Sequence, residues 1–107
     1  MTRLDTNTFF KVAAIFEKLA EIIGGEDSME IEEESITIGG TFKGYDVVIG
    51  SDFNIINVSI ENLDDEKMYE DFTYTIEDFK ILKMCFELSE LIYCWQGLNF
   101  WEEIDKY

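Results

Sequence analysis

The spacing of apolar residues near the N-terminus predicts an amphipathic helix over residues 8–23. Its apolar positions recur every three or four residues, at Phe9, Val12, Phe16, Leu19 and Ile23. Gly24 and Gly25 follow directly, and a glycine just past a helix supplies the left-handed residue that ends it. We therefore expect this helix to end at Ile23.

After these glycines the apolar period changes to two, which is typical of strands. The alternating apolar residues are Met29 and Ile31, then Ile36 and Ile38, then Tyr45, Val47 and Ile49, and finally Ile56, Val58 and Ile60. A break in the alternation between Ile31 and Ile36 indicates a turn near residues 33–35. Further glycine-containing turns separate the later runs, so we expect three or four antiparallel strands that pair in chain order as a meander.

Residues 61–71 are highly charged and show no period, so we expect a loop there. Thr75, with Asp78 three residues later, resembles the capping box that opens a helix. Apolar residues then continue to Trp95, and Gly97 can end the helix. The sequence thus predicts a long second helix that begins near Thr75.

This second helix is apolar around most of its circumference. Its polar side is one narrow stripe, formed by Glu77, Lys80, Lys83, Glu87 and Glu90. Such a helix needs contacts on more than one flank. We expect it to pack on the sheet and against the first helix, or to lend one flank to a partner, for which a homodimer is one option. Beyond it, Asn99 and Glu102 can cap a short terminal helix that carries Trp101.

Together these elements predict an α+β fold in one compact domain over residues 1–107. The charge is unusual, because 24 Asp and Glu oppose 8 Lys and Arg and give a formal net charge of −16. A surface this anionic repels phosphate, so we expect no direct binding to nucleic acid or to anionic membranes. There is no signal-peptide pattern and no apolar run of about 18 residues, so we expect a cytoplasmic protein.

The residue types argue against catalysis, and we expect neither enzyme activity nor a cofactor or metal. Histidine is absent, which removes the commonest general base and the commonest metal ligand. No glycine motif for nucleotide phosphates is present. Cys85 and Cys94 are too far apart on the second helix for a disulfide and lack the partners of a zinc site, so we interpret both as small buried hydrophobes.

Half of the acidic residues fall in two short segments, residues 26–34 and 61–71. Solubility requires far less charge, and self-repulsion at this density destabilises the compact state. On a strand, Glu30 and Glu32 would project to one face about 6.7 Å apart while Met29 and Ile31 face inward, and DNA phosphates repeat about every 3.4 Å along each strand. The segments therefore predict a partner-binding surface. Its candidate residues are Glu26, Asp27, Glu30, Glu32, Glu33, Glu34, Asp64, Asp65, Glu66, Glu70, Asp71 and, as an apolar anchor, Trp101.

The leading hypothesis is a non-enzymatic inhibitor that covers a basic nucleic-acid-binding surface of another protein, as a nucleic-acid mimic. In size, charge and lack of catalytic groups the chain is similar to the small acidic anti-restriction and anti-CRISPR proteins of phages. This resemblance implies a partner such as a restriction or CRISPR effector, whose nucleic-acid channel is positively charged.

Two alternatives stay open. The first is an immunity or antitoxin protein that neutralises a basic nuclease toxin, and the second is an acidic calcium-binding module. In every case we expect like-charge repulsion to raise the pKa values of the crowded carboxylates.

Overall fold

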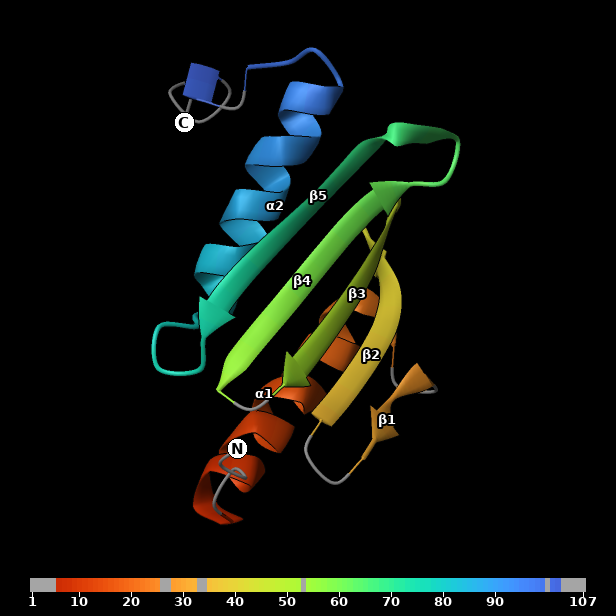
Figure 1. Ribbon diagram of the computed structural model, residues 1–107. Helices are drawn as coiled ribbons and strands as arrows, with labels where there is room; N and C mark the ends of the chain where they lie inside the picture. The colour runs from red at the N-terminus through yellow and green to blue at the C-terminus, as the bar shows by residue number, and fades with distance from the viewer. Residues whose placement is uncertain (1–5, 26–27, 33–34, 53, 100, 103–107) are drawn as a thin grey trace.

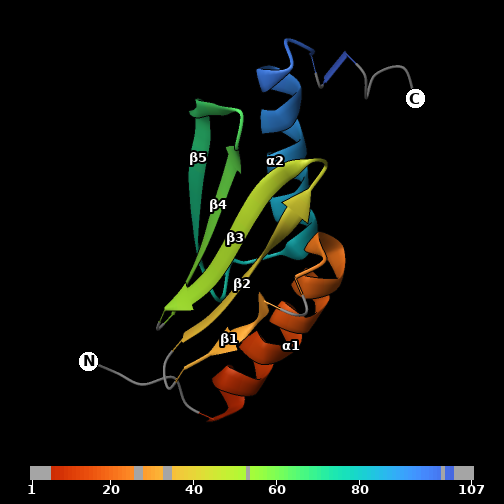
Figure 2. The same ribbon diagram turned by 90° about the vertical axis from the view of Figure 1, so that its right-hand side faces the viewer.

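The computed structural model describes residues 6–25, 28–32, 35–52, 54–99 and 101–102. The elements are α1 (Thr6–Ile23), β1 (Glu30–Ile31), β2 (Ser35–Phe42), β3 (Tyr45–Asp52), β4 (Ile55–Asn62), β5 (Asp65–Thr75) and α2 (Ile81–Trp95). All strand pairs are antiparallel, and the sheet follows the order β1-β2-β3-β4-β5. Both helices lie on one side of the sheet (Figures 1 and 2). The predicted α+β fold and meander are confirmed, with five strands instead of three or four.

The hydrophobic core lies between the sheet and the two helices. The most deeply buried sheet residues alternate along the strands, as the period of two predicts. They include Ile36, Ile38, Val47, Ile49, Ile56, Val58 and Ile60. Val12, Phe16 and Leu19 of α1 and Met84, Leu88 and Ile92 of α2 join the same cluster. We call the side of the sheet that packs on the helices the covered face and the other side the open face.

Close packing between the end of α1 and β2 explains a glycine within the second strand. A Cβ atom added at Gly40 would lie 2.0 Å from the carbonyl oxygen of Ile23. The helix therefore rests directly on the backbone of β2, and only glycine leaves the necessary space. Gly24, with φ of +66°, ends α1 where the sequence predicts.

The prediction of a loop over residues 61–71 is wrong. β4 continues to Asn62, a turn follows at Leu63 and Asp64, and β5 starts at Asp65. The pairing is irregular next to this turn, because Glu61 lies opposite Tyr69 while Asn62 lies opposite Asp65. The extra residues on β5 interrupt the alternation, and dense charge hides what remains of it.

The second helix begins later than the capping pattern predicts. Thr75 and Asp78 do exchange hydrogen bonds, from the Asp78 N–H to Thr75 Oγ1 at 3.2 Å and from Thr75 Oγ1 to Asp78 Oδ2 at 2.9 Å. They form a turn instead of a helix start, since the Ile76 N–H still bonds to the Asn54 carbonyl at 2.9 Å and α2 starts at Ile81. Burial of the side chains of Ile76 and Phe79 holds this connecting segment against the core.

The far end of α2 agrees better with prediction. Gly97, with φ of +74°, follows the helix. Asn99 Oδ1 accepts hydrogen bonds from the N–H groups of Trp101, at 3.1 Å, and Glu102, at 3.3 Å, which is the capping role expected of Asn99. Trp101 and Glu102 are helical, and the rest of the expected terminal helix lies outside the described residues.

One flank of α2 packs on the sheet, as expected. The centroid of the Trp95 ring on this helix lies 5.4 Å from the centroid of the Tyr45 ring on β3. The opposite flank is exposed, most of all at Leu82, whose side chain is 85% exposed.

Both cysteines are free. Cys85 is half-buried, but Cys94 is exposed, so its interpretation as a buried hydrophobe is wrong. No helix among the described residues is both long and apolar enough to cross a membrane.

Candidate partner-binding face

The open face of the sheet is the candidate binding site, and Figure 1 looks onto it. In antiparallel pairs, residues directly opposite each other project to the same side. Because Ile49 and Val58 are opposed and buried on the covered face, the residues at odd offsets from them in β3 and β4 project to the open face. The strand register therefore assigns each residue of the regular ladder to one side.

Among the described residues, five carboxylates project from the open face, and we call them together the acidic face. They are Glu30, Asp46, Asp52, Glu61 and Asp71. Each of the five strands except β2 contributes at least one of them. Asp46 is half-buried and the other four are exposed. The sheet thus spreads fixed negative charge across its whole width.

Three members of the acidic face lie close together, and we call them the acidic triad: Asp46, Glu61 and Asp71. Asp46 on β3 is directly opposite Glu61 on β4. Asp71 on β5 is opposite Ser59, two residues before Glu61, and is therefore its diagonal neighbour. Adjacent strands are about 4.8 Å apart, and like charges directly opposed across strands destabilise a sheet.

None of the described basic residues forms an ion pair with this triad. Lys43 occupies the β2–β3 turn and Lys67 lies beside the β4–β5 turn. The remaining described lysines are on the helices or next to them, at Lys11, Lys18, Lys80 and Lys83. Within the part of the chain that the structure describes, the acidic face takes part in no ion pair.

Asp71 is held in place by two neutral side chains. The hydroxyls of Ser59 and Tyr69 both donate hydrogen bonds to Asp71 Oδ1, at 2.5 Å and 2.8 Å. The Ser59 bond, followed by the Tyr69 bond, lowers the pKa of Asp71 below its ordinary value of 3.8. The expectation that crowding raises the pKa values is therefore wrong for Asp71, because hydrogen bonds to the charged form outweigh the opposing effect of desolvation on the pKa.

Around these carboxylates the open face offers some apolar contact. Thr37, Gly39 and Gly50 carry little or no side chain, and a hydrogen bond of 3.1 Å from Thr73 Oγ1 to Asn57 Oδ1 ties β5 to β4. Val48 and Tyr69 are each 49% exposed. They stand beside the acidic triad in the strand register and can serve as apolar anchors.

Of the described residues of the first predicted acidic segment, Glu30 is the one that reaches the open face. Glu30 lies opposite Thr37, but β1 ends at Ile31, and the Glu32 N–H bonds to the Ser35 carbonyl at 2.8 Å within the turn. The expected strand row of Glu30 and Glu32 is therefore cut short. Ile31, expected to face inward, is 59% exposed because β1 is a two-residue edge strand. Glu26, Asp27, Glu33 and Glu34 lie outside the described residues.

The acidic residues of the second predicted segment lie in three different places: at the β4–β5 turn, on the open face and on the covered face. Asp64 lies in the β4–β5 turn, and Asp65 and Glu66 follow it at the same end of the sheet. Asp65 has a structural role, since its Oδ1 accepts the Lys67 N–H at 3.0 Å. Asp71 belongs to the acidic triad, whereas Glu70 projects to the covered face opposite Ile60.

Trp101 is also remote from the acidic face. Its ring lies 5.4 Å from that of Phe86, on the helical side of the molecule. The structure thus places Tyr69, and not Trp101, where an aromatic anchor for the acidic face would be needed.

Sequence reasoning missed three members of the acidic face: Asp46, Asp52 and Glu61. Asp46 and Asp52 lie outside the two acidic segments, and Glu61 belongs to the second segment but was not selected. The alternation of β3 and β4 could have identified them, since each directly follows a buried position and therefore falls in the other half of the alternation. What the alternation cannot give is the register that places Asp46 opposite Glu61.

Among the described residues there is no group of three or more His, Cys, Asp and Glu side chains arranged to hold a metal ion. The three carboxylates of the acidic triad are therefore not close enough together to coordinate one calcium ion. Comparison of the chain with protein-family models, with curated protein sequences and with solved structures finds no match.

Proposed function

We propose that this protein is a non-enzymatic inhibitor that binds, through its acidic face, a basic nucleic-acid-binding surface of a partner protein. The partner would be a nuclease or an effector of the restriction or CRISPR type. By covering the surface that normally contacts phosphates, the protein would exclude the nucleic acid.

The observation that carries this proposal is the direct opposition of Asp46 and Glu61, with Asp71 beside them. Such a cluster lowers the stability of the free protein, since like charges face each other on neighbouring strands. No described lysine forms an ion pair with any of the three carboxylates. A basic partner would relieve the repulsion, so part of the cost in the free state returns as binding free energy.

The dimensions of the sheet support a phosphate-like charge pattern. Open-face residues repeat about every 6.8 Å along a strand and about every 4.8 Å across strands. Phosphates repeat about every 3.4 Å along each DNA strand. The acidic triad, with one carboxylate on each of three neighbouring strands, is the part of the open face that comes nearest to such a spacing. Asp71, fixed by Ser59 and Tyr69, presents its charge without losing much side-chain freedom on binding.

Charge alone provides association rate and orientation more than affinity. Exposed ion pairs contribute only about 0.2–1 kcal/mol each, so a stable complex also needs apolar contacts. Tyr69 and Val48 supply these next to the acidic triad. Tyr69 is the more suitable anchor for an arginine-rich partner, because a guanidinium can stack on its ring while pairing with a carboxylate.

Three baits can test the proposal in the native host. The first is the wild-type protein, and the second is a face variant with Asp46→Asn, Glu61→Gln and Asp71→Asn. The third is a matched control with Glu17→Gln, Glu21→Gln and Glu77→Gln, which removes equal charge from exposed positions outside the sheet's open face.

We expect the wild type and the control to capture the same basic nucleic-acid-binding protein, and the face variant to lose it. Capture that is equal for all three baits would contradict the proposal. The identity of the captured protein would also separate an anti-defence inhibitor from an immunity protein, since the latter would bring down a nuclease toxin.

A further inference from the structure

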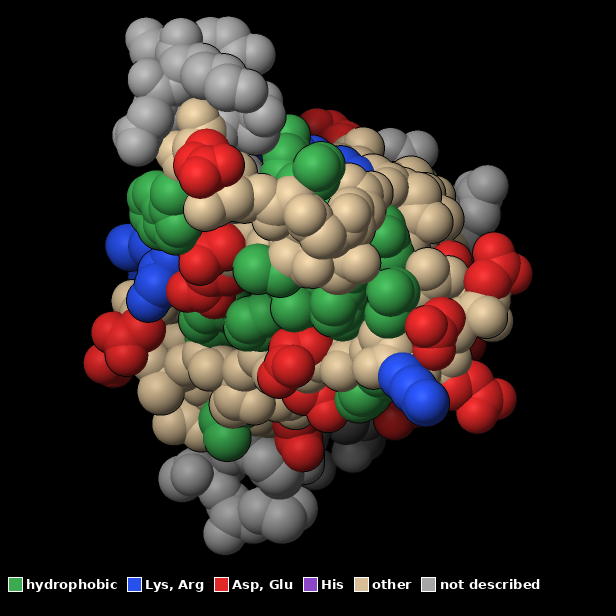
Figure 3. All heavy atoms as spheres, turned by 90° about the horizontal axis from the view of Figure 1, so that it is seen from above, with side chains coloured by type: hydrophobic (Ala, Val, Ile, Leu, Met, Phe, Trp, Pro, Cys, Tyr) green, Lys and Arg blue, Asp and Glu red, His purple; other side chains and the backbone are tan. Residues whose placement is uncertain are grey.

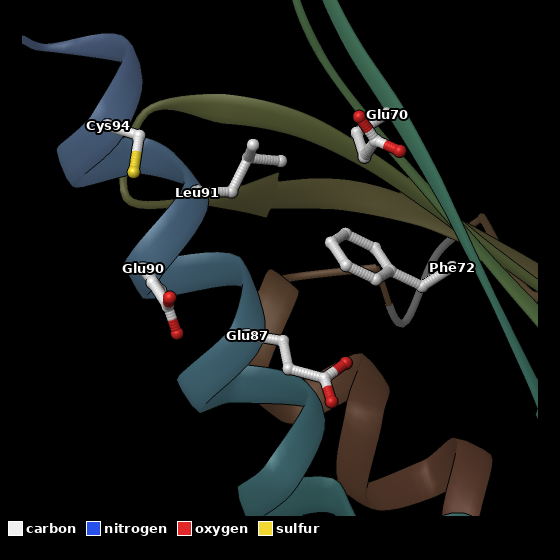
Figure 4. A pocket seen from close by; sticks show the side chains of 6 residues that line it. All are labelled: Glu70, Phe72, Glu87, Glu90, Leu91 and Cys94. Atoms are coloured by element: carbon white, nitrogen blue, oxygen red, sulfur yellow. The ribbon is translucent and has the colours of Figure 1, made fainter.

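A hollow of about 290 Å³ lies between β5 and α2, on the other side of the sheet from the acidic face. Its lining residues are Glu70, Phe72, Glu87, Glu90, Leu91 and Cys94. Figure 4 shows Glu70 and Phe72 on the strand and the other four on the helix. Seen from above, apolar side chains form a band across this end of the molecule, and acidic side chains border it (Figure 3).

The hollow exists because β5 and α2 diverge toward this end. Nearer the start of α2, Tyr74 bridges the two elements through a hydrogen bond from its hydroxyl to Glu87 Oε2. Further along, the covered face of β5 presents Phe72 and then Glu70, which stays exposed although it lies opposite the buried Ile60. A position that would belong to the core in a closed layer is therefore open to a ligand.

The three carboxylates of the hollow differ in how they are satisfied. Glu87 accepts the Tyr74 hydroxyl and lies 3.9 Å from Lys83 Nζ. Burial, and then the bond to Glu87, raises the pKa of Tyr74, so the phenol keeps its proton and continues to hold that carboxylate. Glu70 and Glu90 have no hydrogen-bond or ion-pair partner among the described residues.

The walls of the hollow therefore carry both unpaired carboxylates and apolar side chains. Glu70 stands on the strand wall and Glu90 on the helix, while Phe72 and Leu91 extend toward one another across the gap (Figure 4). An apolar ligand would leave both carboxylates without partners, and an anion would be repelled. A ligand with a cation at each end and a hydrocarbon chain between them satisfies both walls and the apolar floor at once.

We propose that this hollow is a binding site for a linear aliphatic diamine or polyamine. One ammonium pairs with Glu70 and the other with Glu90, and the methylene chain packs on Phe72 and Leu91. This site is independent of the proposed partner-binding function, because it uses other residues on the other side of the sheet.

Isothermal titration calorimetry of the full chain with cadaverine, pentylamine and 1-pentanol, at fixed ionic strength, tests the pairing of both ends. These ligands share a five-carbon chain and differ only in their charged ends. We expect cadaverine to bind up to about fivefold more tightly than pentylamine, since an ion pair at a solvent-accessible carboxylate contributes up to about 1 kcal/mol, and pentanol to bind least. Equal affinity of cadaverine and pentylamine would contradict the proposal and favour a site for a single cation, such as a lysine side chain.

Variants separate the hollow from diffuse attraction to an acidic protein. Glu70→Gln and Glu90→Gln should each lower the affinity for cadaverine by up to about fivefold. Glu66→Gln, an exposed neighbour on β5 that does not line the hollow, is the matched control and should leave the affinity unchanged. If all three variants weaken binding to the same small extent, only nonspecific counterion attraction is present and the proposal is wrong.

Cys94 provides a second readout inside the hollow, since its thiol is free and exposed. Saturating cadaverine should slow alkylation of Cys94 by iodoacetamide several-fold, while pentanol at the same concentration should not. Cys85 is the internal comparison, and tandem mass spectrometry distinguishes the two sites. An alkylation rate of Cys94 that cadaverine leaves unchanged would overturn the assignment of this location, whatever the calorimetry shows.

Discussion

The two faces of the sheet are made from alternate residues of the same strands, but they obey different physical demands. On the covered face, Ile49 and Val58 are opposed and fully buried. Three positions along the register, on the open face, Asp46 and Glu61 are opposed, and neither forms an ion pair with a described cation. The covered face stabilises the fold through burial of apolar side chains, whereas the opposed carboxylates of the open face destabilise it.

This difference shows why neighbours in the sequence are poor guides to a shared surface on a strand. Glu70 and Asp71 are adjacent and appear to belong to one acidic segment. The pleat sends Asp71 to the acidic triad and Glu70 to the hollow beside α2. The two carboxylates therefore serve different surfaces, and the comparison between the faces can be tested one residue at a time.

The largest effect should come from truncating the covered face. Ile60→Ala removes a fully buried side chain, and we expect the free energy of unfolding to fall by about 2–5 kcal/mol. Glu61→Gln, the next residue and a member of the acidic face, should leave it within about 0.5 kcal/mol or raise it slightly. Urea unfolding followed by circular dichroism measures both. Similar losses for the two variants would mean that Glu61 is part of the packed structure.

Two adjacent glycines provide the second comparison. Gly40→Ala should destabilise the protein by about 1–3 kcal/mol, because the new Cβ would lie 2.0 Å from the Ile23 carbonyl oxygen and force α1 away from β2. At Gly39, on the open face, an added Cβ would have no neighbour closer than 3.9 Å. Gly39→Ala should therefore be tolerated, with little change in the thermal midpoint. Equal effects of the two substitutions would contradict the described contact between α1 and β2.

The third comparison replaces charge repulsion on the open face by attraction, and we expect a small increase in the free energy of unfolding. Glu61→Lys places a cation opposite Asp46, and we expect the free energy of unfolding to rise by about 0.2–1 kcal/mol at low salt and by less at high salt. Glu17→Lys on α1 makes the same charge change away from the triad and serves as the control. A gain of equal size in the control would show that the overall charge, and not the opposed pair, is responsible.

The smallest predicted effect concerns the protonation of Asp71. Its pKa is lowered mainly by the Ser59 hydroxyl, so this contribution to stability is complete above the ordinary value of 3.8 and is lost as the pH falls through the lowered folded-state pKa. Ser59→Ala should raise the pKa of Asp71 toward its ordinary value. The stability difference between the wild type and Ser59→Ala should therefore be constant near neutral pH and decrease below about pH 4. NMR titration of the Asp71 carboxyl carbon checks the shift, and an unchanged pKa in Ser59→Ala would refute this assignment.

Much of the fold could be predicted because its determinants are local. The spacing of Phe9, Val12 and Phe16 specifies the first helix, and the alternation from Ile36 to Ile60 specifies the middle strands. The fifth strand was hidden, since an irregularity near Lys67 breaks its period and its exposed positions are nearly all polar. The later start of α2 was also hidden, because the Thr75 and Asp78 side chains form the same hydrogen bonds in a turn as in a helix cap.

The candidate site was less predictable for a physical reason. Its defining feature is a pairing between residues on different strands, and local sequence patterns carry no information on register. Crowding along the chain therefore pointed to Glu30 and Asp71 but passed over Asp46 and Glu61. Once the register is known, the acidic face follows from alternation alone.

Competition with nucleic acid tests the central claim most directly. A fluorescent nucleic acid bound to the captured basic partner would be titrated with the wild-type protein, with the face variant and with the matched control. We expect the wild type and the control to displace it with the same midpoint, which rises steeply with salt, and the face variant to require at least tenfold more protein. Displacement by the face variant at the wild-type midpoint would show that Asp46, Glu61 and Asp71 are not the surface that replaces nucleic acid.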